Sequence, residues 1–433
     1  MLSLTKSRHA GKSFFFKLFL LITLLVLSSG DIFTQVNWTK YPGNPVMSGS
    51  GNGTWDKHVF MPSVLFNADS NRYEMWYCGS YGPEVSWLPY RIGFAWSADG
   101  INWTKYGNPV LNPDPGTWDA GSVEVSWVIR ENGQYKMWYA GLNNNIRQIG
   151  YATSPDGITW TKNANPVLSA GSAAWEAGGV FWCSVLSNSG QYTMYYTGVD
   201  ITQAQIGRAT SLDGINWQRD TINNPVLSGT LGQWDEDVFG PRCLFTGNLI
   251  HMWYTGVYNN ERQIGYATSP DGIIWDKNDN PVLTKGSSVS WDGSYVEAGT
   301  VMLLGDSVFQ MWYDGSREYT PTNLWRIGVA TAPLVSVSVE QEITLPTEFT
   351  LEQCYPNPFN PSTTIHFSIP KEVQVNLSVY NILGENIREL KNEMMKQGYY
   401  DVEFNASDLA SGIYLYRIKA GDFVETKKMI FLK

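Results

Sequence analysis

Two glutamates stand at the same place in a motif that recurs along the chain. Glu124 and Glu297 each follow a tryptophan by six residues, and apolar residues flank both of them, as in the interior of a strand. A carboxylate in such surroundings needs a partner or a function, because an unpaired buried charge is costly. Two carboxylates that meet can do acid–base chemistry, in which one donates a proton and the other accepts one. Arg242 is a candidate ion-pair partner for both.

Asp237, Asp56 and His58 are further acids and bases expected near the same end of the strands. Every one of these residues can also be read as a structural hydrogen-bonding group, and for the two glutamates both readings stay open. A Trp-Asp or Trp-Glu pair recurs five times, which favours a structural role for its acidic members Asp56, Asp119, Glu176, Asp235 and Asp292. His251 is expected on the surface.

The elements that position these residues are repeats of about 57 residues. A tryptophan followed by Asn-Pro-Val occurs five times, with successive tryptophans 65, 57, 57 and 58 residues apart. An aromatic-x-Met-aromatic-Tyr-x-Gly segment, an Ile-Gly-x-Ala segment and an Asp-Gly turn accompany it. Asp-Gly between apolar segments indicates a hairpin, so these aspartates are expected to be structural. Each repeat thus holds four strands, and such units arranged around an axis form a β-propeller.

The two ends of the repeat region are complementary. The fifth repeat stops at Pro333-Leu334 without its Asp-Gly turn, while an unpaired Trp strand, residues 38–46, stands alone at the start. We predict that this strand completes the last blade, which would remove two exposed sheet edges. The alternative, an open solenoid, would normally show capping repeats with a polar outer face.

Counting along each inner strand predicts which side chains face the propeller channel. From the tryptophan of each Trp-Asp or Trp-Glu pair, positions five and seven are apolar in all five repeats and are expected to pack between blades. Positions six and eight mix polar and apolar residues and are expected to face the channel. This places Glu124, Glu297 and Arg242 in the channel.

The repeats resemble the five-bladed propellers of glycoside hydrolase families 32, 43 and 130 over residues 38–334, through their Asn-Pro-Val-Leu, Trp-Asp, Tyr-x-Met-Trp-Tyr-x-Gly and Ser-Pro-Asp-Gly-x-x-Trp motifs. The resemblance implies a substrate funnel where inner strands begin and second strands loop to third strands. In family 43 the general base is an Asp before a Pro and the general acid is a Glu in Glu-Gly-Pro. Here Met61 and Phe239 occupy those positions, so another pair would have to act, and Glu124, Glu297 and Asp237 are the candidates.

Two long loops carry the candidate substrate-binding residues. The segments 80–91 and 316–326 belong to neighbouring blades of a closed ring and bring together Trp87, Arg91, Trp325 and Arg326. Aromatic faces beside guanidinium groups suit the C–H faces and hydroxyl edges of sugars. The other reading is that these rings only pack the loops. His58 and Arg242 complete the predicted binding set for a carbohydrate.

Composition and the first residues bear on location and cofactors. A net charge of −10 argues against a nucleic-acid partner. Residues 1–30 read as a signal peptide, whose apolar run is far shorter than the ~20 residues that span a bilayer, so no transmembrane segment is expected after cleavage. Four dispersed cysteines are expected to be free and buried, and four histidines share no ligand spacing. No metal or other cofactor is therefore expected, although a calcium ion in the channel is left open.

The last part of the chain forms a separate module. We expect the propeller over residues 31–335, a linker over 336–350 and a small immunoglobulin-like β-sandwich over 351–433. The module resembles the type A C-terminal sorting domain of the type IX secretion system through Tyr-Pro-Asn-Pro-Phe-Asn-Pro, Val-Tyr-Asn-x-Leu-Gly, Ser-Gly-Ile-Tyr and Lys-Lys-Met. That resemblance implies a translocon partner and export through the periplasm to the cell surface or the medium. The alternative is an ordinary immunoglobulin-like binding module.

Three function hypotheses follow from the sequence. The first is a secreted carbohydrate-active propeller, a glycosidase or glycan phosphorylase with unusual channel carboxylates. The second is a glycan-binding propeller without catalysis, which the missing family carboxylates favour. The third is a protein-binding propeller at the cell surface.

Overall fold

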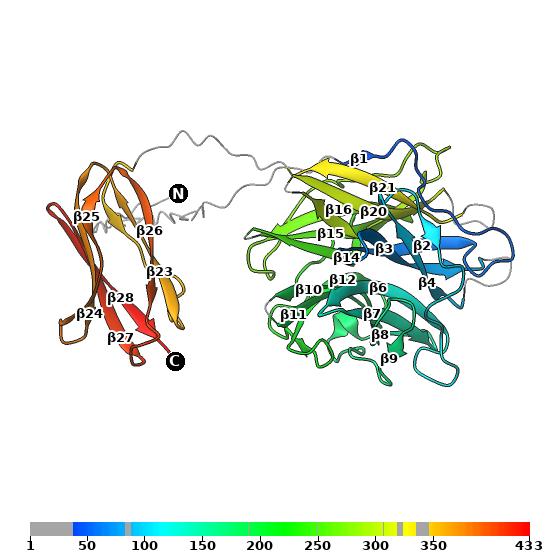
Figure 1. Ribbon diagram of the computed structural model, residues 1–433, viewed down its shortest axis with the longest axis horizontal. Helices are drawn as coiled ribbons and strands as arrows, with labels where there is room; N and C mark the ends of the chain where they lie inside the picture. The colour runs from blue at the N-terminus through cyan, green and yellow to red at the C-terminus, as the bar shows by residue number, and fades with distance from the viewer. Residues whose placement is uncertain are drawn as a thin grey trace, which may run out of the picture. The chain divides into compact units, whose positions relative to one another are not determined.

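The computed structural model describes residues 38–82, 88–188, 190–247, 249–305, 307–317, 324–334 and 346–433. The predicted signal peptide, residue Trp87 and most of the predicted linker lie outside these ranges. The described residues belong to two compact units, one before and one after the gap at 335–345, and each is described by itself (Figure 1). They contain strands and a single 3₁₀ turn, Ala174–Glu176, and no helix of theirs could cross a membrane. The all-β prediction is confirmed.

The first unit is a five-bladed propeller. In four blades, consecutive antiparallel strands follow one another outward in chain order. Blade one holds β2 (His58–Asn67), β3 (Arg72–Ser80), β4 (Arg91–Ser97) and β5 (Thr104–Lys105). Blade two holds β6 (Ser122–Glu131), β7 (Gln134–Asn143), β8 (Ile146–Ser154) and β9 (Thr161–Lys162). Blade three holds β10 (Gly179–Asn188), β11 (Gln191–Val199), β12 (Ala204–Ser211) and β13 (Gln218–Arg219), and blade four holds β14 (Asp237–Thr246), β15 (Leu249–Tyr258), β16 (Glu261–Ser269) and β17 (Asp276–Lys277).

The fifth blade is closed by the start of the propeller, as predicted. It holds β18 (Tyr295–Glu297), β19 (Val301–Leu304), β20 (Val308–Ser316) and β21 (Arg326–Pro333). Its outermost strand is β1 (Thr39–Lys40), which pairs antiparallel with β21 so that Thr39 lies opposite Thr331. A bridge from Met47 to Ile327 repeats the bridge from Leu111 to Ile92 in blade one. The closed ring therefore replaces the open solenoid.

A buried carboxylate fixes the outer strand of every blade. The acidic residue of each Trp-Asp or Trp-Glu pair accepts a charged hydrogen bond from a lysine or arginine on the fourth strand and another from a tyrosine hydroxyl on the second strand. The five groups are Asp56 with Lys105 and Tyr77, Asp119 with Lys162 and Tyr139, Glu176 with Arg219 and Tyr196, Asp235 with Lys277 and Tyr254, and Asp292 with Lys40 and Tyr313. The structural interpretation of these carboxylates is confirmed.

The glycine of the Tyr-x-Gly motif is required by close packing against these pairs. A Cβ atom on Gly79 would lie 2.3 Å from the Trp55 ring, and Gly141 and Gly198 stand equally close to Trp118 and Trp175. Any larger residue would push the tryptophan away from the sheet.

The Asp-Gly turns join neighbouring blades. Asp99 accepts the backbone N–H groups of Ile101 and Asn102, and Gly100 has the positive φ of 73° that the turn demands. The Gly100 carbonyl also accepts the indole N–H of Trp312 in the adjacent blade at 2.8 Å. Trp76 and Trp138 reach the turns of blades two and three in the same way, and Tyr195 reaches that of blade four through its hydroxyl.

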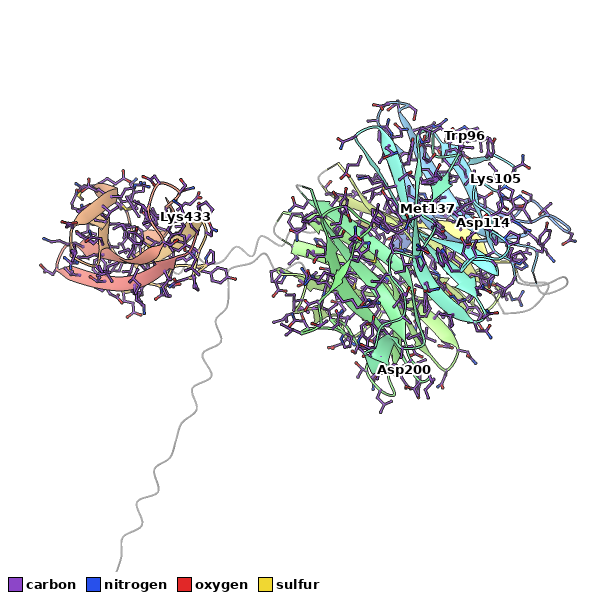
Figure 2. All side chains as sticks on the ribbon, turned by 90° about the horizontal axis from the view of Figure 1, so that it is seen from below. Trp96, Lys105, Asp114, Met137, Asp200 and Lys433 are labelled. Atoms are coloured by element: carbon purple, nitrogen blue, oxygen red, sulfur yellow. The ribbon has the colours of Figure 1, made fainter. Side chains whose placement is uncertain are left out.

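The second unit packs two sheets around an apolar core. One sheet holds β22 (Thr350–Leu351), β23 (Ser362–Ile369) and β26 (Gly398–Asn405); the other holds β24 (Val373–Asn381), β25 (Asn386–Met395), β27 (Gly412–Ala420) and β28 (Phe423–Phe431). Ile365, Val375, Tyr416 and Phe431 are buried between them. This unit matches the predicted β-sandwich. Figure 2 shows side chains filling both units, with Lys433 in this one and Met137 among the strands of the propeller.

We expect Lys40→Met to weaken ring closure, because Asp292 would keep its burial and lose its cation. Lys40 Nζ lies 2.5 Å from the Asp292 carboxylate, whose side chain is 3% exposed. The free energy of unfolding should fall by about 1–3 kcal/mol. All 19 tryptophans precede the second unit, so tryptophan fluorescence during urea unfolding reports the propeller alone.

Lys285→Met is the matched control, since Lys285 pairs with Glu261, which is 52% exposed. Removing that pair should change the free energy of unfolding by less than about 1 kcal/mol. Equal effects of the two substitutions would contradict a closing role for Lys40.

Candidate functional site

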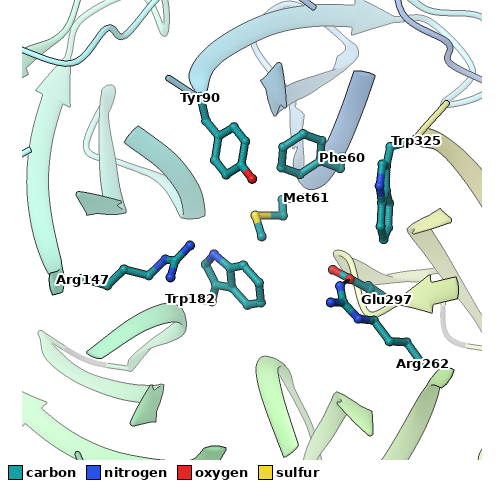
Figure 3. Close-up of a pocket in the computed structure, with 8 residues that line it drawn as sticks. All are labelled: Phe60, Met61, Tyr90, Arg147, Trp182, Arg262, Glu297 and Trp325. Atoms are coloured by element: carbon teal, nitrogen blue, oxygen red, sulfur yellow. Dashed lines mark hydrogen bonds and ion pairs between the residues drawn. The ribbon is translucent and has the colours of Figure 1, made fainter. Parts of the chain in front are cut away.

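All five blades contribute to one central pocket. It has a volume of about 160 Å³ and is lined by Phe60, Met61, Tyr90, Arg147, Trp182, Arg262, Glu297 and Trp325. Figure 3 shows Tyr90, Phe60 and Trp325 on one side of a common space and Arg147, Trp182 and the Glu297–Arg262 pair on the other. The eight residues that line this space are called the central pocket below.

Four lining residues share one position of the repeat. Tyr90, Arg147, Arg262 and Trp325 each stand two residues before the isoleucine of the Ile-Gly motif, at the start of a third strand. The sequence predicts Trp325 in the binding set, together with Arg91 and Arg326, which lie one residue beyond this position. Alternate residues of a strand point to opposite faces, and neither of these arginines lines the pocket. Alignment of the repeats on this isoleucine would have found Arg147 and Arg262.

A β-bulge in the inner strands changes which side chains face the pocket. The register shifts between Phe60 and Ser63 and between Phe181 and Cys183, and similar shifts occur in blades two and four. Met61 and Trp182 have positive φ angles of 54° and 35° there, which are unusual for residues with side chains. Trp182 lines the pocket because of its bulge. Phe60 precedes its bulge and lies opposite Cys78, in the same register as Glu124 opposite Ala140, because blade one has one residue fewer between its Trp-Asp pair and this position. The prediction that positions five and seven pack between blades is wrong for both residues.

Glu124 is fully buried and engaged on both oxygens. Its Oε1 accepts hydrogen bonds from Nε and Nη2 of Arg147, both at 3.3 Å, and its Oε2 accepts the indole N–H of Trp182 at 2.5 Å. Because Arg147 and Trp182 both line the pocket, this carboxylate holds two of the lining side chains in place. The expected partner, Arg242, is not the one that the structure provides.

Glu297 is the single carboxylate among the pocket-lining residues. It forms an ion pair with Arg262, whose guanidinium also lies over the rings of Tyr295 and Trp325 at 5.4 and 6.0 Å. The side chain of Glu297 is 6% exposed, so part of it remains open to a ligand. The pair gives the pocket a nearly neutral charge on this side.

Arg242 is buried and bound to the backbone of three other blades. It donates to the carbonyl oxygens of Ser126, Cys183 and Ala298 at 2.8, 3.3 and 3.2 Å. Burial lowers the pKa of its guanidinium, while Asp314 opposes that effect. Arg242 does not line the pocket and ties its supporting strands together instead.

Other predicted site residues have structural contacts. His58 is fully buried and its Nδ1 accepts the backbone N–H of Trp325 at 3.3 Å, so it supports a lining residue. Asp237 is half-buried and accepts the N–H of Ala204 at 2.8 Å. The guanidinium of Arg91 lies over the ring of Tyr81 at 5.4 Å. Their catalytic or binding roles stay predictions.

His251 is fully buried, so its expected surface position is wrong. Its ring bonds to Thr246 and Tyr266 and stacks on Trp253, and burial lowers the pKa of His251 to about 4. The burial of His251 could not be predicted from the repeats, because the other four hold polar residues at the same position.

A recurring hydrogen bond joins each inner-strand bulge to the blade before it. The middle residue of Tyr-x-Gly accepts a backbone N–H of the next blade: Cys78 from Val125, Thr197 from Gly240, Thr255 from Ala298, and Asp314 from Met61. In blade two this residue is Ala140, whose side chain has no hydrogen-bond acceptor. The residue of blade three at the corresponding position is Trp182.

The described residues contain no group of three or more His, Cys, Asp or Glu side chains able to hold a metal ion. Both glutamates near the channel are already paired with arginines, which leaves little negative charge for a calcium ion. The four cysteines are free and buried, as expected.

Two family models match parts of the chain. The model of the glycosyl hydrolases family 32 N-terminal domain matches residues 126–298, which run from blade two into blade five. The model of the secretion system C-terminal sorting domain matches residues 353–432, which cover the second unit.

Curated relatives match part of this chain over part of their own length. A 1,2-beta-oligomannan phosphorylase of Thermoanaerobacter sp. is 26% identical over 186 residues, which cover 37% of this chain and 62% of the relative. An uncharacterized protein of Mycobacterium tuberculosis is 29% identical over 133 residues, covering 30% of this chain and 44% of the relative. The chain thus spans less than two thirds of either relative.

Solved structures share the fold. The beta-1,2-mannobiose phosphorylase from Listeria innocua has a TM-score of 0.54 at 15% identity, covering 68% of this chain and 96% of its own. A structure described with the GH130 mannoside phosphorylases and hydrolases that target beta-1,2 mannosidic linkages has a TM-score of 0.55 at 21% identity, covering 69% and 94%. At these identities the likeness concerns the fold alone. The chain therefore combines a five-bladed propeller that resembles the glycosyl hydrolases family 32 N-terminal domain over residues 126–298 with a second unit that resembles the secretion system C-terminal sorting domain over residues 353–432.

Proposed function

We propose that the central pocket binds one sugar unit of a glycan and cleaves its glycosidic bond by phosphorolysis. The observation that carries this proposal is the charge set of the pocket, in which one carboxylate, Glu297, accompanies two guanidinium groups, Arg147 and Arg262. Phosphorylases are also among the curated relatives. By that relation, β-1,2-linked mannosides are the first substrates to test.

The walls of the pocket suit a sugar ring. Phe60, Tyr90, Trp182 and Trp325 offer aromatic faces for C–H groups, and the two arginines offer donors for hydroxyl or phosphate oxygens. A volume of about 160 Å³ lies below the roughly 300–1,000 Å³ of pockets for drug-sized ligands. A single terminal sugar unit is therefore the expected occupant.

Phosphorolysis fits a pocket with one carboxylate better than hydrolysis does. Hydrolysis needs a second carboxylate, either to activate water or to attack the sugar. In phosphorolysis a phosphate oxygen forms the bond to the anomeric carbon while the bond to the glycosidic oxygen breaks, and one acid protonates that leaving oxygen. The proton of hydrogen phosphate is released as the sugar phosphate forms, which restores the acid. Arg147 and Arg262, each of which is also bonded to a glutamate, can donate hydrogen bonds to the phosphate oxygens.

A second candidate function is glycan binding without catalysis. It is favoured by the engagement of both glutamates, since Glu124 is fully buried and Glu297 is paired with Arg262. In that case the pocket would retain sugars and leave their bonds intact.

The full chain incubated with β-1,2-mannooligosaccharides should release a sugar phosphate only when inorganic phosphate is present. Glu297→Gln should reduce that release at least a hundredfold, because the leaving oxygen would lose its proton donor. Arg130→Gln is the control, since Arg130 pairs with Asp69 and does not line the pocket. Release of free sugar without phosphate would indicate hydrolysis, and binding without release would support the second candidate.

Trp182→Ala should weaken glycan binding about tenfold or more, because an aromatic face would leave the pocket. Glu124→Gln should weaken it less, since glutamine still accepts the Trp182 N–H and loses only the charge opposite Arg147. Calorimetry measures both. Trp96→Ala is the control, as Trp96 does not line the pocket, and an equal loss there would contradict the assignment.

We propose that residues 351–433 are read by the outer-membrane translocon. Their deletion should leave the propeller in the periplasm, whereas the full chain should reach the medium or the cell surface. Fractionation with antibody against the propeller measures the difference. Secretion of the truncated chain would contradict this role.

A further inference from the structure

A second carboxyl group lies beside Glu297 without lining the pocket. Asp314 on β20 stands directly opposite Glu297 on β18 in the antiparallel register, and it is fully buried. Side chains of directly opposed residues project from the same face, with Cβ atoms about 4.5–5.5 Å apart. Blade five thus places two carboxyl groups together at the pocket.

The position of Asp314 in the repeat shows what an aspartate adds there. Thr197 and Thr255 occupy the same position in blades three and four and accept one backbone N–H each. Asp314 does the same through Oδ1, which accepts the N–H of Met61 at 3.0 Å. Its Oδ2 is buried and finds no hydrogen-bond partner among the described residues. Threonine would satisfy the structural need, so the second oxygen calls for another explanation.

The charges around Asp314 favour its neutral form. Glu297, Arg242, Arg262 and Cys78 are the ionisable groups that face it. Burial, and then the charge of Glu297, raise the pKa of Asp314 well above its usual range, although the Met61 N–H and the two arginines oppose that rise. Glu297 has its own cation in Arg262, so the two carboxyls lie in opposite environments.

We propose that Asp314 and Glu297 hold one proton between them, and that Asp314 is a positioning residue which supplies this proton to the pocket through Glu297. The transfer of this proton to the substrate rests on the proposed phosphorolysis. When phosphate binds to Arg262, the ion pair between Arg262 and Glu297 weakens. The proton then passes from the Asp314 carboxyl to the Glu297 carboxylate and from there to the leaving oxygen. The proton released from hydrogen phosphate then returns to the pair.

The proton on Asp314 is tested by the pH dependence of unfolding. A folded carboxyl with a raised pKa binds a proton that the unfolded chain has already lost, so its contribution to stability is present in acid and is lost as pH rises through the folded pKa. Relative to Asp314→Asn, the folding equilibrium constant of the unmodified protein should fall about tenfold per pH unit between the pKa of this carboxyl in the unfolded chain and its pKa in the folded protein. Asparagine keeps an acceptor for Met61, and Asp314→Thr, which copies blade four, serves if asparagine does not fold.

Glu74→Gln is the matched control, because Glu74 is equally buried but is bonded to Arg72, Asn67 and Tyr135. Because Asp314 is retained in that variant, the fall of the folding equilibrium constant attributed to Asp314 should persist. Parallel curves for the unmodified protein and both Asp314 variants would overturn the shared proton.

The supply of the proton is tested by the pH profile of phosphorolysis. Asp314→Asn should lower kcat at least tenfold and shift its pH profile, with little change in KM for phosphate. An unshifted profile would overturn the supply role. If the unmodified protein turns over no glycan, the proposed function fails, while the unfolding comparison still decides whether Asp314 carries the proton.

Discussion

The propeller depends on a buried carboxylate that binds a cation of the fourth strand in every blade. The outer strands hold only two residues each, so their backbone pairing is slight. The ion pair and the tyrosine hydroxyl supply what the short strand lacks, and the tryptophan beside the carboxylate packs on the glycine of the second strand. In blade five the same group is built from distant parts of the chain, with Lys40 meeting Asp292. The closed ring places the third-strand residues around one axis, and the pocket follows from that closure.

Much of the fold could be predicted because repeats report equivalent environments. The missing Asp-Gly turn and the spare N-terminal strand predicted the closure, and recurrence of the Trp-Asp pairs identified them as structural. The bulges could not be read in this way. Strict alternation along a strand assigns Trp182 to the space between blades, and a single inserted residue reverses that assignment. Phe60 is assigned wrongly for another reason, because one residue fewer separates it from Trp55 than separates Glu124 from Trp118.

The site was predicted in part, for a related reason. Glu124 and Glu297 could be predicted because a carboxylate between apolar strand residues is unusual, but their arginine partners could not. Arg147 and Arg262 come from third strands, and a pairing between strands depends on register, which the position of a residue in its own motif does not give. Arg242 was the nearest cation along the inner strands, yet its donors are taken by backbone carbonyls that only the closed ring brings together.

Closure of the ring by a separate strand has an energetic cost at one seam. In blades one, two and three, the polar group of a second-strand aromatic residue donates a hydrogen bond to the Asp-Gly turn of the next blade. Blade five donates the same hydrogen bond to the turn of blade one. The sequence of blade five lacks the Asp-Gly pair, and the buried indole nitrogen of Trp253 has no acceptor among the described residues. An unsatisfied donor of this kind costs about 1–3 kcal/mol. The boundary between blades four and five thus lacks a hydrogen bond that the other four boundaries have, and a parallel backbone pairing of Arg262 with Tyr295 joins the two blades there instead.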